Sequence, residues 1–224
     1  MKLSIVVPVL NEAENLPALL TRLVPLRACG TEIIVVDGGS RDGSPALVAH
    51  AGVTLIHSGT GRARQMNAGA ARASGDALLF LHADTALPAF ADRVVAAALD
   101  AGTRAWGRFD VRIAGRSPLL RVVAAMMNLR SRLTGIATGD QAMFVTRRAF
   151  DAVGGFPDLP LMEDIELSRR LKAVSRPICL PQRVLTSGRR WETRGGWRTI
   201  FLMWRLRFAW WRGVPAERLA RRYR

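Results

Sequence analysis

The sequence lacks any apolar run long enough to cross a bilayer as a helix. Such a span takes about 18 or more apolar residues with few charges, and no stretch of this chain approaches that length without a charge. The N-terminal apolar run is cut by Pro8 and then by Asn11 and Glu12, before the apolar region of a signal peptide is complete. We therefore expect no membrane span and interpret the N-terminal run as a first strand.

Cysteine is almost as scarce. The sequence has only Cys29 and Cys179, which lie far apart and show neither the spacing of a zinc site nor that of a disulfide framework. A reducing, cytoplasmic compartment is therefore expected. Both cysteines are expected to be ordinary core residues.

Lysine is nearly absent, although the chain is strongly basic. Only Lys2 and Lys172 are lysines among 33 basic residues, and 18 acidic residues leave a formal net charge of +15. Arginine holds phosphate in a planar fork of donors, so this balance implies an anionic partner: a nucleic acid, a phosphorylated small molecule or an anionic lipid surface. Composition does not choose among these three.

Nothing in the sequence marks a domain boundary. The 224 residues are 49% hydrophobic, enough for a sizeable core, and the chain contains no repeat or low-complexity linker. We predict a single domain over residues 1–224.

The first half alternates short β-branched runs with helical patterns. This rhythm predicts an α/β fold with a doubly wound, mostly parallel sheet and helices on both faces. Ligands of such sheets bind outside the carboxyl ends of the strands, so Asn11, Glu12, Asp37 and Asp84 are expected to converge on one site. The expected strands are 3–8, 32–37, 53–58 and 77–82, and the expected helices are 14–23, 44–51 and 62–73.

The second half is less regular. Strands are expected at 106–113 and 142–146, and helices are expected to begin at Ser117-Pro118 and near Glu163. The tail from Trp197 is expected to form one or two helices.

The loop DGGSRDG (37–43) allows two interpretations. It is either a nucleotide-binding turn with Asp37 at a strand end or a glycine-rich turn capped by an aspartate. It matches neither GxGxxG nor GxxxxGK[ST], which disfavours a Rossmann dehydrogenase and a P-loop ATPase.

Seven segments taken in order are far more specific than any one of them. Together they resemble the family-two nucleotide-sugar glycosyltransferases with the GT-A fold, up to about Trp191, and most of all the small, soluble bacterial members. The segments are SIVVPVLNE (4–12), VVDGGSRDGS (35–44), GRARQMNAG (61–69), FLHADT (80–85), GDQAMFV (139–145), GGFPDLPLMEDIELSRRL (154–171) and SGRRW (187–191).

The resemblance implies a Rossmann-like nucleotide-sugar-binding half over 1–100. In it Pro8 and Glu12 form the wall of the nucleotide site and Asp37 accepts hydrogen bonds from the base. Arg62 and Gln65 are the candidates for contacts to base and ribose. For Arg62 and its neighbour Arg64, solvated charges at the start of a helix remain an equal alternative.

FLHADT occupies the place of the family's DxD motif. Only Asp84 remains of the two acids, and His82 stands where the first would be; we assign His82 no role. The resemblance implies that Asp84 ligates Mg²⁺ or Mn²⁺. One carboxylate suffices where the donor diphosphate supplies further oxygens, although a strand-end aspartate is also a common cap.

The resemblance implies an acceptor and catalytic half over 101–191. The family's ED motif maps Asp164 to the general base of an inverting transfer, with Glu163 as its catalytic neighbour, whereas in isolation the two acids would be a helix-start charge pair. Asp140 lines the acceptor side. The family's QxxRW motif is represented here by Ser187, Arg190 and Trp191. The resemblance implies that Arg190 lies near the departing phosphates. Trp191 either packs under a sugar or acceptor or is an ordinary packed residue.

The segment 192–224 is a basic, tryptophan-rich helical tail. From 189 onward the chain has eleven arginines and two glutamates, a formal charge of +9. Two interpretations stay open: a helix in the interface of an anionic membrane, or a helix docked on the core with a solvated basic face. The first would make the protein peripheral on the inner face of the cytoplasmic membrane, with a lipid-linked acceptor.

Two other functions were weighed. A sugar nucleotidyltransferase needs a glycine-rich loop with a basic residue after the first strand, where this chain has PVLNEAENL. A non-enzymatic, arginine-rich nucleic-acid-binding protein fits the charge, but no helix-turn-helix, zinc-finger or RNP pattern is present. We therefore predict a metal-assisted transfer from a nucleoside-diphosphate sugar to an acceptor hydroxyl or phosphate, and no specific nucleic acid.

Overall fold

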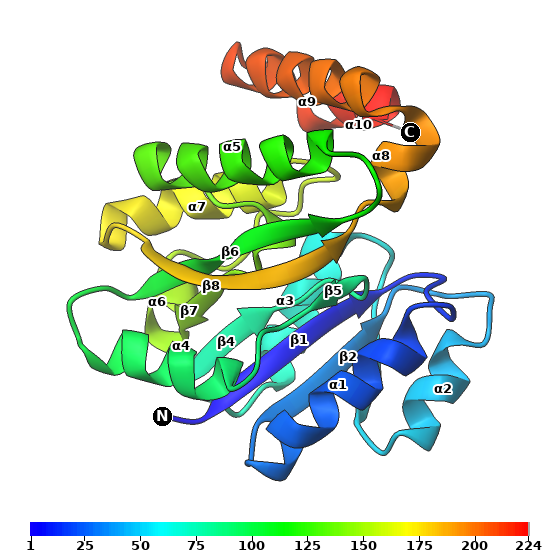
Figure 1. Cartoon of the computed structure of the whole chain (residues 1–224). Helices are drawn as coiled ribbons and strands as arrows, with labels where there is room; N and C mark the ends of the chain where they lie inside the picture. Colours follow the sequence, from blue (N-terminus) through cyan, green and yellow to red (C-terminus); the bar gives the residue numbers. More distant parts are fainter. Residues whose placement is uncertain (224) are drawn as a thin grey trace.

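The computed structural model describes residues 1–223, apart from the side chains of Arg190 and Arg194. Its strands form one curled sheet, and most of them match the predicted segments within two residues (Figure 1). The strands are β1 (Leu3–Val9), β2 (Glu32–Asp37), β3 (Thr54–His57), β4 (Ala77–Phe80), β5 (Thr85–Ala86), β6 (Trp106–Ala114), β7 (Phe144–Thr146) and β8 (Ile178–Ser187).

The helices fill the intervals between strands and continue beyond the last of them. The predicted helix starts at Ser117-Pro118 and Glu163 are confirmed, since Pro118 caps α5 and Glu163 opens α7. The helices are α1 (Leu16–Ala28), α2 (Ser44–His50), α3 (Arg62–Arg72), α4 (Ala91–Asp100), α5 (Leu119–Thr134), the 3₁₀ turn η1 (Gly139–Gln141), α6 (Arg147–Ala152), α7 (Glu163–Val174), α8 (Arg189–Arg194), α9 (Gly196–Trp211) and α10 (Ala216–Tyr223).

The sheet order is β3-β2-β1-β4-β7-β6-β8-β5. The first four strands in this order are parallel, so their carboxyl ends lie at one edge, as the strand–helix alternation predicts. The direction reverses at β7, which is antiparallel to both β4 and β6, while β8 runs parallel to β6. The result is a mixed, mostly parallel sheet in which the nucleotide-side strands meet the second half at β7.

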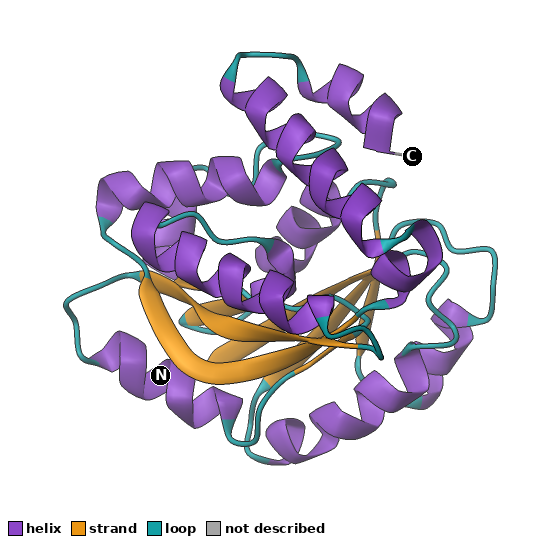
Figure 2. Ribbon diagram, turned by 45° about the horizontal axis from the view of Figure 1, so that its top comes forward, coloured by secondary structure: helices purple, strands orange, loops and turns teal. Residues whose placement is uncertain are grey.

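Helices cover both faces of the sheet (Figure 2). One face packs against α1, α2, α4 and α5, and the other against α3, α6 and α7. Strands β1, β2 and β4 are buried almost throughout, which explains why their sequences are continuous apolar runs instead of alternating ones.

The C-terminal helices form a third layer. Leu206 of α9 and Leu219 of α10 are buried together with Met162, which precedes α7. The chain turns between the two helices at Gly213, whose φ of +80° favours glycine. The tail is therefore docked on the domain, and no helix among residues 1–223 has both the length and the apolarity to cross a membrane.

The opposite face of α9 is exposed and apolar. Five large side chains at spacings of three and four residues, each at least 59% exposed, form a stripe along the helix: Trp197, Phe201, Trp204, Phe208 and Trp211. One face of α9 is thus docked on the domain, and the other is exposed and carries the apolar stripe. The membrane interpretation of the tail stays a prediction.

One prediction about the core was wrong. Cys29 is exposed and Cys179 is half-buried. Cys29 directly follows the last residue of α1, where its backbone N–H closes the final turn, and at this helix end the core does not cover its side chain.

Candidate active site

Two adjoining cavities open at the carboxyl ends of the parallel strands. Their volumes are about 440 Å³ and about 250 Å³, and they share a boundary because the same four residues line both. Those four are Glu12, Arg62, His82 and Asp84. The site is therefore in two parts, with the FLHADT loop between them.

The smaller cavity lies over the ends of β1 and β2. Pro8 and Glu12 line it, as the resemblance implies. Gln65 also lines it, but its amide nitrogen already donates to the carbonyls of Val9 (2.7 Å) and Val36 (2.8 Å). Gln65 thus joins the two strand ends and leaves only its carbonyl oxygen for a ligand.

Asp37 lies at the end of β2, and it lines neither of the two cavities among the described residues. Its carboxylate accepts hydrogen bonds from the N–H groups of Gly39 (3.0 Å) and Ser40 (3.2 Å) and lies 3.5 Å from Nδ1 of His57. Burial acts to raise the pKa of Asp37, but the hydrogen bonds from Ser40, Gly39 and His57 outweigh it and hold the pKa below its usual range. Asp37 stays an ionised acceptor that shapes the DGGSRDG turn.

Asp84 lies in the short loop between β4 and β5. The loop is fixed from two sides: Thr85 N–H donates to the His82 carbonyl (3.1 Å), and Ser187 N–H at the end of β8 donates to the Asp84 carbonyl (3.2 Å). The Asp84 carboxylate accepts only a long hydrogen bond from the Thr85 hydroxyl, at 3.3 Å. Its remaining lone pairs are available in the cavity.

A divalent cation fits Asp84 only in combination with a ligand. The described residues contain no group of three or more His, Cys, Asp or Glu side chains that could hold a metal by themselves. Mg²⁺ is commonly held by one or two protein carboxylates together with substrate phosphates and water. Asp84 on the cavity wall meets that requirement when a diphosphate supplies the other oxygens.

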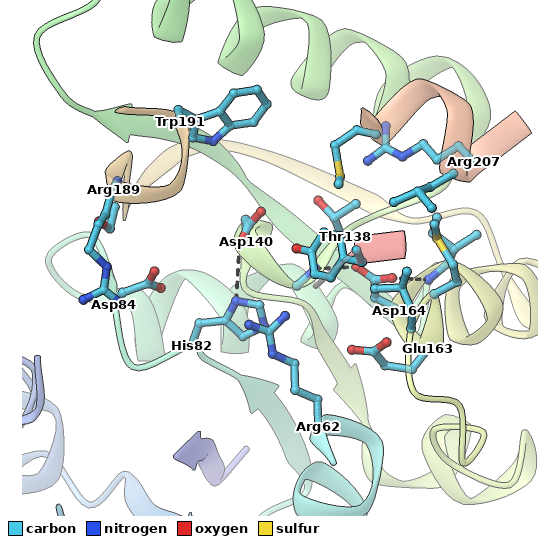
Figure 3. A pocket seen from close by; sticks show the side chains of 18 of the residues that line it. Arg62, His82, Asp84, Thr138, Asp140, Glu163, Asp164, Arg189, Trp191 and Arg207 are labelled. Carbon is cyan, nitrogen blue, oxygen red and sulfur yellow. Dashed lines mark hydrogen bonds and ion pairs between the residues drawn. The ribbon is translucent and has the colours of Figure 1, made fainter. Parts of the chain in front are cut away.

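His82, which the sequence left without a role, connects the two halves of the site. Its Nδ1 lies 3.3 Å from Asp140 in η1 (Figure 3). The neighbouring Gly139 packs directly on the ring: a Cβ there would lie 2.4 Å from Nε2. The FLHADT loop and the GDQ turn are therefore held against each other through this histidine, and Asp140 reaches the larger cavity as predicted.

Glu163 and Asp164 line the larger cavity at the start of α7. The chain enters the helix through Met162, whose φ is +70°. Asp164 accepts hydrogen bonds from the N–H of Gly139 (2.9 Å) and from its own neighbour Ile165 (2.7 Å). The base predicted from the ED motif is thus anchored to the same turn that presents Asp140.

The surroundings of Glu163 change its ionisation, because the residue is only 8% exposed. Burial, and then repulsion by Asp164, raise the pKa of Glu163 to about 7, although Arg62 and His82 act in the opposite direction. Glu163 can therefore exchange a proton near neutral pH.

The segment after β8 forms another wall of the larger cavity. Ser187, Arg189 and Trp191 line it, and Arg189 reaches to within 3.5 Å of the Glu14 carboxylate. The prediction for Arg190 concerns a side chain outside the described part of the structure.

The sequence reasoning missed two arginines, one in the wall of the larger cavity and one on α5. Arg207 of α9 lines the larger cavity, and burial lowers its pKa. Burial, and then repulsion by Arg207, lower the pKa of Arg130 of α5 to about 10. The helical period of α9 could have indicated that Arg207 is not solvated. Arg207 lies on the same face of the helix as Met203 and Trp210, which pack against the cluster of Met162, Leu206 and Leu219.

The structure separates the two arginines at the start of α3. Arg62 lines both cavities, whereas Arg64 pairs with Asp158 at 2.9 Å on the surface. The solvated alternative therefore applies to Arg64. Of the predicted site residues, the larger cavity brings together Glu12, Arg62, Asp84, Asp140, Glu163, Asp164 and Trp191, and the smaller one adds Pro8 and Gln65.

The site is thus a cavity at the strand ends joined to a second cavity with carboxylates at a helix start. The model of "Glycosyl transferase family 2" matches residues 4–153. The chain belongs to this family of glycosyltransferases. The match decides in favour of the glycosyltransferase over the nucleotidyltransferase and the nucleic-acid-binding protein.

Relatives with assigned names include an undecaprenyl-phosphate 4-deoxy-4-formamido-L-arabinose transferase of Klebsiella pneumoniae. It is 32% identical over 154 residues, which cover 62% of this chain and 46% of the relative. A protein of the same name from Yersinia pestis is 34% identical over 152 residues, with the same coverage. The chain spans about half the length of these relatives.

Solved structures share the fold at lower identity. S. aureus TarS (residues 1–349), solved with UDP-GlcNAc, has a TM-score of 0.67 at 19% identity, over 84% of this chain and 58% of that one. The mannosyltransferase PcManGT from Pyrobaculum calidifontis, solved with GDP-Man and Mn²⁺, has a TM-score of 0.67 at 22% identity, over 93% and 61%. These likenesses confirm the GT-A fold.

Proposed function

We propose that this glycosyltransferase inverts the anomeric centre of a sugar that it moves from a nucleoside-diphosphate donor to an acceptor oxygen. The observation that carries the proposal is the two-part cavity with Asp84 on one side and Asp164 on the other (Figure 3). Solved relatives of the same fold bind UDP-GlcNAc and GDP-Man, which supports a donor of this class.

The smaller cavity would hold the nucleoside and the larger one the sugar and acceptor. Pro8 and Gln65 line the nucleoside side, and Arg62 on the shared wall faces the diphosphate. Asp84 would hold Mg²⁺ or Mn²⁺ together with the diphosphate, and the metal would neutralise the charge that develops on the leaving group. The Mn²⁺ in the PcManGT complex supports a divalent ion here.

The chemical step transfers the anomeric carbon between two oxygens. The acceptor oxygen attacks the anomeric carbon from the face opposite the diphosphate and forms the new C–O bond. The bond from that carbon to the diphosphate oxygen breaks, and its electron pair leaves with the nucleoside diphosphate. An acceptor hydroxyl passes its proton to Asp164; an acceptor phosphate attacks as the oxyanion and needs no base. Glu163, with a pKa near 7, can take part in moving that proton out of the cavity.

Transfer by an Asp164→Asn variant tests the assignment of the base. With a panel of nucleoside-diphosphate sugars and hydroxyl acceptors, we expect kcat to fall by about 10² or more while donor affinity is unchanged. Asp158→Asn, which removes a surface carboxylate paired with Arg64, is the matched control and should keep the parent rate. An Asp164→Asn variant as active as the control would show that Asp164 is not the base.

The finer localisation is also a proposal: the protein binds the anionic inner face of the cytoplasmic membrane and takes a lipid-linked acceptor there. The exposed stripe of α9 has a counterpart on α5, where Val122, Met126, Leu129 and Leu133 are each 50% to 71% exposed at spacings of three and four residues. The two helices are neighbours, because Gly196 at the start of α9 packs against Leu119 at the start of α5, and they lie together at the top of Figure 1.

Charge favours an anionic lipid surface over an uncharged protein partner. Arg121 on α5 and Arg198, Arg205 and Arg212 on α9 are exposed beside the apolar stripes. Each basic residue near an anionic leaflet contributes about 1 kcal/mol, and apolar side chains flanked by cations are typical of helices in the membrane interface. The Klebsiella and Yersinia relatives carry undecaprenyl phosphate in their names, which supports a lipid carrier.

Vesicle co-sedimentation tests this localisation. The parent should pellet with anionic vesicles and be released at high salt, and the double variant Trp204→Ser/Phe208→Ser should lose binding. Phe90→Ser, which removes a 63% exposed aromatic at the start of α4, is the control and should bind as the parent does. Equal binding of the double variant, or a parent that dimerises through this face and ignores vesicles, would contradict the proposal.

A further inference from the structure

Arg207 in the wall of the larger cavity and Arg130 on α5 carry charges that the described residues do not pair. Within the described residues neither Arg130 nor Arg207 makes an ion pair, and neither donates a side-chain hydrogen bond. Nε and Nη2 of Arg130 are buried and unsatisfied. A buried guanidinium without a hydrogen-bond acceptor is costly, and a bound anion or an ordered water beside it would reduce that cost.

The charge of Arg207 acts on Arg130, because it is the second cause, after burial, of the lowered pKa of Arg130. Asp164 and Asp140 act on both arginines in the opposite direction. Asp164 accepts hydrogen bonds from two backbone N–H groups, and Asp140 lies 3.3 Å from Nδ1 of His82.

The position of the pair separates it from the donor diphosphate. In Figure 3 Arg207 lies on the far side of the cavity from Asp84 and Arg189, and Asp164 lies between. An anion held by Arg207 would therefore sit beyond the catalytic carboxylate, on the side from which an acceptor approaches.

We propose that Arg207, supported by the positive charge of Arg130, binds a phosphate group of the acceptor and thereby places the acceptor beside Asp164. A phosphate monoester is nearly dianionic at neutral pH and offers three acceptor oxygens, which matches the guanidinium fork of Arg207. Assigning this anion to the acceptor rests on the proposed function. Arg207 stands on α9, outside the residues 4–153 that the family model matches, so a helix beyond the matched region selects the acceptor.

Binding of inorganic phosphate in the absence of donor tests the site directly. Phosphate should raise the melting temperature of the parent, and the shift should disappear in Arg207→Gln. Arg205→Gln changes an exposed arginine on the same helix and should respond as the parent does. Saturation of the donor side with a nucleoside diphosphate and Mn²⁺ should leave the phosphate response in place. An equal phosphate response in parent and Arg207→Gln would overturn the proposal.

Stability without phosphate separates ligand binding from a structural role. Because Nε and Nη2 of Arg130 are buried and unsatisfied, Arg130→Met should melt at a higher temperature than the parent in phosphate-free buffer and should respond more weakly to phosphate. Arg121→Met, on the exposed face of the same helix, should change neither. If Arg130 instead stabilises the fold, Arg130→Met melts lower and keeps the phosphate response, which contradicts the assignment.

Two phosphate sources are then compared. In one arm the ligand is a water-soluble sugar phosphate; in the other it is a polyprenyl phosphate in phosphatidylcholine vesicles, which supply no net surface charge. The ligand that represents the true acceptor class should bind to the parent. It should bind to Arg207→Gln at least about tenfold more weakly, which is the loss expected for one charge-assisted contact. Arg207-independent binding in both arms defeats the proposal. Failure of the enzyme to bind any sugar nucleotide would count against the proposed function and leave the phosphate result standing.

Discussion

Replacing Glu163 by glutamine should change how the stability of the protein depends on pH. The pKa of Glu163 is raised from 4.5 to about 7 in the folded protein, first by burial and then by repulsion from Asp164. A carboxyl group of this kind binds its proton more tightly in the folded than in the unfolded chain. Its stabilising contribution is full below pH 4.5, is lost as the pH rises, and is gone once the pH has passed about 7.

The size of the effect follows from the two pKa values. One pKa unit corresponds to about 1.4 kcal/mol, so the difference between 4.5 and about 7 corresponds to about 3 kcal/mol of unfolding free energy. Glutamine cannot ionise and does not incur this loss. Glu163→Gln should therefore gain up to about 3 kcal/mol on the parent between pH 4.5 and pH 8, in addition to any constant offset from the new amide.

Urea unfolding of both proteins from pH 4.5 to pH 8 measures this difference, and groups unaffected by the substitution cancel. Glu166→Gln, on the same helix, is a control of opposite sign. Hydrogen bonds from Arg169 and Arg170 hold the pKa of Glu166 below its usual range although burial opposes them. Its contribution is present above its unfolded pKa and is lost as the pH falls. Parallel stability curves for the parent and Glu163→Gln would refute the argument about the buried carboxyl.

Three further changes have defined outcomes. Asp84→Asn should abolish the tighter binding of Mn²⁺ that a non-hydrolysable donor produces in the parent, and calorimetric Mn²⁺ titrations with and without the donor measure it; equal metal affinity of the parent in both titrations contradicts the shared site. Gly139→Ala should lower activity with little change in global stability, because its Cβ would meet the His82 ring at 2.4 Å; steady-state kinetics and thermal unfolding test both parts, and parent-like kinetics would mean that the ring yields without consequence. Asp110→Asn should destabilise the protein by roughly 3–5 kcal/mol, since the fully buried Arg108 pairs with this carboxylate; chemical denaturation measures the loss, and a loss below about 1 kcal/mol would mean that Arg108 finds another partner.

The first half of the fold was predictable because its strands are apolar on both faces. The runs that became β1, β2 and β4 are recognisable from composition alone, since helices cover the sheet above and below. β8 was not predicted. Its sequence ICLPQRVLTS contains a proline and polar residues, and much of the strand is exposed, so its pairing with β6 depends on tertiary context and not on its own pattern.

The residues of the candidate site also differ in how far the sequence alone could predict them. Asp84 and Glu12 were predictable because they follow buried strands, and the carboxyl ends of parallel strands share an edge. Asp164 was identified through the resemblance and not through its local pattern, which is that of any acidic helix start. Arg130 and Arg207 are 77 positions apart in the sequence, so no local pattern relates them, and only the packed structure shows that both are half-buried without a hydrogen-bonding partner among the described residues.

The two-residue strand β5 determines when, during synthesis, the site can form. Thr85 and Ala86 pair with Thr186 and Leu185 of β8, so the loop that carries Asp84 takes its fixed shape only after the chain has extended about 100 residues further. A nascent chain that has already folded its parallel strands on the ribosome would hold the smaller cavity with an unanchored Asp84 loop. The two cavities, which share Asp84, thus reach their final shape together, late, when β8 joins the sheet.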